Sequence, residues 1–144
     1  MAKQFKFRLD QLLDLRRMKE NLAEREAADA RLAVQECNQV ILDLMTKEDE
    51  AKREQREMQE RSVDVGLLRM ASEYLAAMDR MLKREYQKLQ GLVLVEIEKR
   101  RLLTEAHQGV RVLERLREKQ GKLHQQGLDL EERKFLDEIA RRTA

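Results

Sequence analysis

The sequence contains no proline, and its helical periodicity is interrupted at one place only, between residues 61 and 66. Valine and glycine, which are poor helix formers, gather in this short stretch. Ser62 and Asp64 are good N-cap residues, because their side-chain oxygens can accept hydrogen bonds from the free amides of a helix start. The pattern predicts a helix over about residues 9–60, a turn over about 61–66 and a second helix over about 67–141. The alternative is one unbroken helix that runs through the weak stretch.

The composition favours long helices over a globular core. Charged residues make up 40% of the chain and aromatic residues 3%, which leaves few large side chains to fill a core. Chains dominated by Ala, Glu, Lys, Leu and Arg with helical periodicity are typical of coiled coils. We therefore expect a single all-α domain over residues 1–144, a long antiparallel two-helix coiled-coil hairpin in which the second helix overhangs the first.

Steps of three and four residues along each helix trace an apolar seam in the heptad rhythm of a coiled coil. In the first helix the predicted seam consists of Leu9, Leu12, Arg16, Lys19, Ala23, Glu26, Ala30, Ala33, Cys37, Val40, Leu44, Lys47, Ala51, Glu54 and Met58. In the second helix it consists of Leu68, Ala71, Leu75, Met78, Leu82, Leu89, Leu92, Val95, Leu102, Ala106, Val110, Leu113 and Leu116. We expect Cys37 to be a small buried side chain of this seam and not a reactive thiol.

The position of the turn also predicts the register of the two helices. A turn centred near residue 64 places residue i opposite about residue 128 − i, so that Phe5 faces about Leu123. The second helix beyond this point has no partner in the chain, and an amphipathic helix without a partner is marginal in water. A binding partner is therefore expected there. Glycines on both sides of residues 122–126 predict a possible bend near residues 120–127.

No residue pattern indicates catalysis. The glycines are scattered and form no phosphate-binding loop, and His107 and His124 lack neighbouring ligands at metal-binding spacing. We expect no catalytic residue, no metal and no cofactor, and thus no enzyme. Acidic residues accompany basic clusters such as residues 99–101, and aromatic residues for base stacking are lacking, so we expect no specific nucleic-acid binding.

The location expected from the sequence is the cytosol. The first residues contain no apolar signal segment, and no stretch approaches the roughly 18 apolar residues that span a membrane. A single cysteine suits a reducing compartment. We therefore expect a soluble, monomeric rod without a transmembrane segment.

Both ends of the sequence resemble the flagellar export protein FliJ family, which is itself similar to YscO-type proteins. The segments that carry the resemblance are Phe5-Lys6-Phe7-Arg8-Leu9, Leu12-Leu13, Arg16, Lys19-Glu20, Val112-Leu113-Glu114-Arg115-Leu116-Arg117-Glu118-Lys119, Glu131 and Leu136-Asp137-Glu138-Ile139-Ala140. The resemblance implies a coiled-coil stalk or adaptor of the flagellar type III export apparatus, located in the cytoplasm and peripherally at the inner membrane. The implied partners are the export ATPase hexamer, the cytoplasmic domain of the export gate membrane protein, and export chaperones.

The resemblance also implies a surface for the export gate and chaperones early in the second helix. Tyr74, Met78 and Met81 have the i, i+4, i+7 spacing of one helix face, and we expect them to bind this partner. The next member of the stripe is Glu85, where an acid departs from the family pattern. The alternative for Met78 is a core position.

The predicted ATPase-binding surface combines the two ends of the chain, which a hairpin brings to the same end of the molecule. It consists of Phe5, Phe7, Leu9, Leu128, Leu136 and Ile139. The alternative for the two phenylalanines is that they pack against the far end of the other helix.

Two other functions remain open at this point. One is the equivalent stalk protein of a virulence type III secretion system, whose sequence would have the same features. The other is a generic structural coiled coil with weak nucleic-acid binding.

Overall fold

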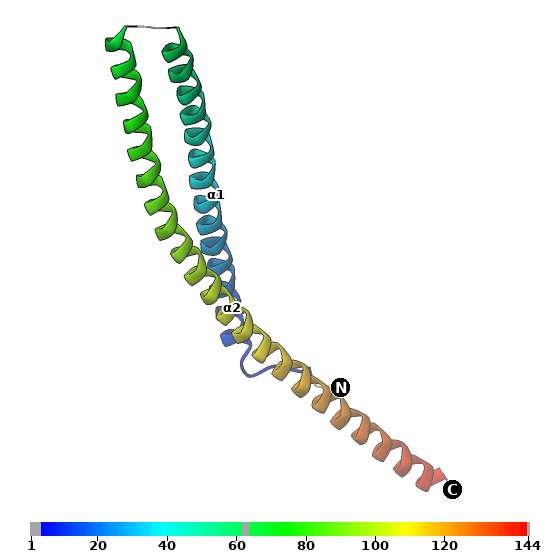
Figure 1. Cartoon of the computed structure of the whole chain (residues 1–144). Helices are drawn as coiled ribbons and strands as arrows, with labels where there is room; N and C mark the ends of the chain where they lie inside the picture. Colours follow the sequence, from blue (N-terminus) through cyan, green and yellow to red (C-terminus); the bar gives the residue numbers. More distant parts are fainter. Residues whose placement is uncertain (1–3, 62–63, 144) are drawn as a thin grey trace. The chain divides into compact units, whose positions relative to one another are not determined.

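The structure of the protein, a computed structural model, describes residues 4–61 and 64–143. These residues form two long helices, α1 (Asp10–Glu60) and α2 (Val65–Thr143), and contain no strand (Figure 1). The helices pack against each other, and α2 is the longer of the two, which confirms the predicted two-helix hairpin. No helix in the described part of the chain combines the length and the apolar character needed to cross a membrane.

Asp64 starts α2 as an N-cap, as the sequence predicts. Its carboxylate accepts a hydrogen bond from the amide of Gly66 at 3.3 Å, and its carbonyl oxygen accepts one from the amide of Leu67 at 3.1 Å. The cap allows α2 to begin at Val65, two residues before the start that the sequence predicts. Gly66 is therefore part of the first helical turn and not of the connection. Ser62, the other predicted cap, lies outside the described residues.

The chain divides into two compact units, a terminal unit (Met1–Glu24 and Leu102–Ala144) and a central unit (Arg25–Arg101). In the terminal unit, Leu13 of α1 is buried together with Val110 and Leu113 of α2, and Leu9 packs against this cluster. The core of this unit is thus a narrow strip between the two helices.

Polar contacts fix the register of the helices in the terminal unit. Asp10 pairs with Arg117 at 3.4 Å, and Arg17 pairs with Glu114 at 3.3 Å, so the helices are antiparallel here. The ring of Phe5 lies 5.6 Å from the ring of His124, next to the predicted position opposite Leu123. α2 is helical throughout residues 120–127, where the sequence predicts a possible bend.

The central unit has its own cluster and the same antiparallel register. Cys37 and Ile41 of α1 are buried with Leu82 of α2, and three further leucines pack around them: Leu44, Leu89 and Leu92. Gln55 donates a hydrogen bond to Ser72 at 3.0 Å, one residue from the predicted register.

Cys37 is a buried free thiol of the seam, as predicted. Burial raises the pKa of this thiol, and both a hydrogen bond to Glu85 and the negative charge of that carboxylate raise it further. The Sγ atom lies 3.6 Å from Oε2 of Glu85. The thiol therefore stays protonated and acts as a small hydrophobic side chain with a weak donor.

The predicted seam of α1 is correct at every second position and at Glu26 and Ala33, and it is wrong by one residue at Leu12, Lys19, Val40, Lys47 and Glu54. Leu13 and Ile41 are buried, with 1% and 5% of their surfaces exposed, whereas the predicted Leu12 and Val40 are exposed. From Leu9, the interior follows a step of four and then of three, whereas the predicted seam follows three and then four. Both orders keep the seven-residue repeat, and adjacent apolar residues at both places made the choice ambiguous.

The antiparallel hairpin predicts a short distance between Arg17 and Glu114 within one molecule. Both side chains are about half exposed, so spin-labelled cysteines at these positions, in a Cys37→Ala background, should leave the fold intact. The expected distance between the two spin labels is below roughly 20 Å, because the helices that carry them are packed side by side. It is measured by double electron–electron resonance.

Dilution with unlabelled protein is the control, because it leaves an intramolecular distance unchanged. A short distance that disappears on dilution would show that the contact forms between molecules, and would contradict both the hairpin and the monomer that we predict.

Candidate partner-binding surfaces

The last part of α2 presents apolar side chains to solvent. Every described residue from 129 to 143 is exposed. Four of them are large and apolar: Leu130, Phe135, Leu136 and Ile139. The reason is the unequal length of the helices, because Phe5 already lies beside Gly121 and His124. This segment, residues 128–143, is called the overhang below.

The helical repeat places most of these side chains on one side of the overhang. Leu128, Phe135 and Ile139 follow at i, i+7 and i+11, which share one face, and Leu136 flanks that face. These four residues form the overhang stripe. Phe135 is 63% exposed and was missing from the predicted site, although its spacing from Leu128 could have identified it. Leu130 lies on the opposite face of the helix.

The structure corrects the part of the predicted ATPase surface that comes before α1. Phe7 is buried, with 4% of its surface exposed, and Leu9 packs against the core cluster of the terminal unit. Both are therefore packing residues, which is the alternative stated for Phe7. Phe5 is partly exposed and lies against His124 and Gly121 of α2.

The predicted gate-binding stripe also separates into exposed and buried members. Tyr74 and Met81 are 50% and 48% exposed, whereas Met78 is 4% exposed. Met78 is therefore a core residue, and its place in the stripe was wrong. The physical reason is that the i+4 position of this stripe coincides with a heptad position of α2. Glu85 is half-buried and accepts the Cys37 hydrogen bond, so it also belongs to the helix interface.

A shallow surface hollow lies beside Tyr74 in the central unit. Tyr74 lines it with Met58 of α1 and with Leu67 and Met70 of α2. Met70 is exposed, and methionine side chains adapt well to different partner surfaces. Met58, Leu67 and Met70 were not among the predicted site residues. Leu67 and Met70 precede Tyr74 by seven and four residues on α2, so their spacing could have identified them, whereas Met58 is placed next to Tyr74 only by the pairing of the two helices.

The basic cluster at residues 99–101 is neutralised by acids. Lys99 pairs with Glu26 of α1 at 3.0 Å, and Arg100 and Arg101 pair with glutamates of their own helix, Glu96 and Glu98. The expectation that acids accompany this cluster is confirmed.

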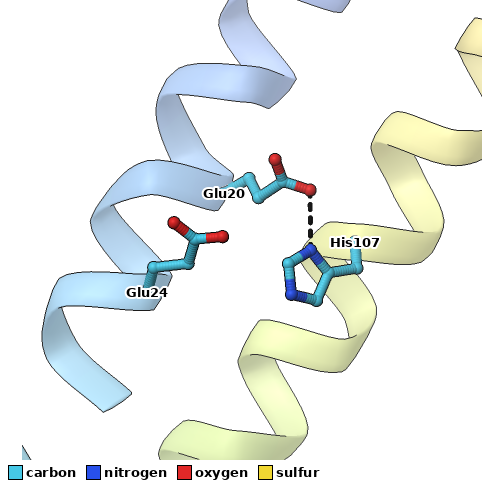
Figure 2. A group of neighbouring side chains, drawn as sticks. All are labelled: Glu20, Glu24 and His107. Atoms are coloured by element: carbon cyan, nitrogen blue, oxygen red, sulfur yellow. Dashed lines mark hydrogen bonds and ion pairs between the residues drawn. The ribbon is translucent and has the colours of Figure 1, made fainter. Parts of the chain in front are cut away.

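His107 has a partner that its sequence neighbourhood does not show. Its Nδ1 atom lies 2.7 Å from Oε2 of Glu20, and the carboxylate of Glu24 lies close to both (Figure 2). The prediction that His107 lacks neighbouring ligands is correct for residues near it in the sequence. It is wrong for the folded chain, because the pairing of α1 with α2 brings Glu20 and Glu24 next to His107.

The fold and these surfaces define a two-helix coiled-coil protein that carries exposed apolar residues on its longer helix. A family model described as flagellar FliJ protein matches residues 5–144. The chain therefore belongs to the flagellar FliJ family and is a coiled-coil protein related to flagellar type III protein export. No curated protein and no solved structure shows a significant match to it.

The different burial of Met78 and its neighbours predicts different effects on stability. Met78→Ala removes a buried side chain and should lower the free energy of unfolding by about 2–5 kcal/mol. Tyr74→Ala and Met81→Ala remove exposed side chains and should change it by no more than about 0.5 kcal/mol. Urea unfolding followed by circular dichroism measures all three. A loss for Met81→Ala as large as that for Met78→Ala would place Met81 in the core.

Proposed function

We propose that this protein is a non-catalytic adaptor of flagellar export that binds the export ATPase ring through the overhang stripe. The exposed surface around Tyr74 and Met81 binds the cytoplasmic domain of the export gate and also serves export chaperones. Contact with the gate would hold the protein at the inner membrane. The observation that carries the proposal is the exposure of residues 129–143, in which Phe135, Leu136 and Ile139 lie on or beside one face of the helix.

The overhang has the properties of a helix that completes its burial on a partner. An isolated amphipathic helix is marginally stable, because its apolar face is not buried against another surface. Docking of residues spaced at i, i+7 and i+11 into a groove is a common way in which helices are recognised. The export ATPase supplies such a groove in this proposal, and the family to which the chain belongs supports that choice of partner.

Removing the overhang stripe should weaken binding to the ATPase. The triple variant Phe135→Ala, Leu136→Ala, Ile139→Ala should raise the dissociation constant for the purified flagellar export ATPase at least tenfold, or about 1.4 kcal/mol. The reason is that alanine cannot fill the groove that these side chains would occupy. Fluorescence anisotropy of the full-length labelled chain measures the constant.

Leu130→Ala is the matched control for this experiment, since Leu130 and Leu136 are equally exposed at 55% and lie on different faces. The control should bind as tightly as the unchanged protein. Equal binding of the triple variant and the control, with helicity retained in both, would exclude the overhang stripe as the ATPase contact.

The gate surface is tested separately from the overhang. Tyr74→Ala combined with Met81→Ala should weaken binding to the purified cytoplasmic domain of the export gate at least several-fold, because both side chains are exposed on one face. The double variant should still bind the ATPase. Met18→Ala is the control, because Met18 is an exposed methionine of α1 outside this surface. Unchanged gate binding by the double variant would exclude Tyr74 and Met81 from the contact.

A further inference from the structure

Three side chains that can bind a metal ion converge in the terminal unit. Glu20 and Glu24 are one turn apart on α1, and His107 faces them from α2 (Figure 2). One donor atom from each residue lies within 4.8 Å of the other two. The donors come from positions 87 residues apart in the chain, so only the pairing of the two helices brings them together.

In the part of the chain that the structure describes, the two carboxylates have no basic partner other than this histidine. Among the described residues, Glu24 makes no hydrogen bond and no ion pair, and the interaction of Glu20 is with Nδ1 of His107. Two like charges at i and i+4 repel each other and destabilise a helix. At the other interhelical pairs of this unit, by contrast, an arginine faces the acid, as in Asp10–Arg117 and Arg17–Glu114.

The donor set selects the kind of ion. An imidazole nitrogen with two carboxylate oxygens suits Zn²⁺, with the remaining coordination position filled by water. Mg²⁺ and Ca²⁺ prefer oxygen donors only, so the histidine disfavours them. Two carboxylates and a neutral imidazole also balance the charge of a divalent cation.

The distances require only small movements of the side chains. With metal–ligand bonds of about 2.1 Å, donor atoms around one ion lie roughly 3–4 Å apart. The Nδ1–Oε2 distance of 2.7 Å must therefore open slightly, and the separation of up to 4.8 Å must close by about 1 Å. Glu24 is exposed, so rotation of its side chain can supply most of this movement.

We propose that Glu20, Glu24 and His107 form a binding site for a divalent transition-metal ion of the zinc type, which links α1 to α2 in the terminal unit. The ion replaces the direct contact between Glu20 and His107 and neutralises the repulsion between the two glutamates. Binding to the folded hairpin only would stabilise it, because a ligand that binds the native state alone shifts unfolding to higher temperature.

Isothermal titration of the full-length chain with Zn²⁺ tests the site. We expect a stoichiometry of one ion per chain and an increase in Tm on saturation. His107→Gln should abolish both effects, and Glu24→Gln should weaken the affinity at least tenfold, since loss of a ligand costs no less than loss of a supporting residue. Circular dichroism without zinc checks that the variants retain their helicity.

Two matched controls separate this site from other zinc binding. His124→Gln removes the other histidine, and Cys37→Ala removes the single thiol, and both should bind zinc as the unchanged chain does. Glu24 is exposed and has no partner among the described residues, so its variant keeps the test valid even if His107→Gln fails to fold. The proposal is overturned by absence of zinc binding, or by binding that persists in His107→Gln or is unchanged in Glu24→Gln.

Discussion

Two helices packed side by side can bury only one strip of each helix, and most of the remaining surface stays in contact with water. In this protein the strip contains a few buried side chains per unit, such as Leu13 and Leu113 in one and Ile41 and Leu82 in the other. Each buried residue therefore carries a large share of the packing energy. The exposed ion pairs beside the strip contribute little energy, since solvent screens them, but their arrangement favours one register over its neighbours.

This constraint explains which parts of the fold could be predicted from the sequence. The interruption at residues 61–66 predicts the hairpin and its register, because a turn fixes which residues face each other. The choice between Leu12 and Leu13, or between Val40 and Ile41, could not be made from one helix alone. Both residues of each pair are apolar and both fit a seven-residue repeat, so the packing of the opposite helix decides which one is buried.

The same limit applied to the candidate sites. Tyr74, Leu136 and Ile139 are exposed, but Met78 and Phe7 are buried and Leu9 packs against the core cluster of the terminal unit. Residue type does not separate these two groups, because a partner-binding residue and a core residue are equally apolar in a coiled coil. The contact between Glu20 and His107 could not be predicted for a different reason. The two residues are far apart in the sequence, and their side chains meet only in one exact register of the helices. A shift of the seam by one residue would separate them.

In the terminal unit, the paired part and the unpaired part of α2 depend on each other. The overhang has no packing partner among the described residues, so its helical order must extend from the paired turns before it. Those turns are held by the small cluster around Leu13 and by the contacts of Asp10, Arg17 and Glu20 with α2. Most of these contacts are exposed and individually weak. A metal ion shared by Glu20, Glu24 and His107 would strengthen this pairing without adding to the apolar core. It would thereby stabilise the base from which the overhang extends, while leaving the overhang stripe itself free for a partner.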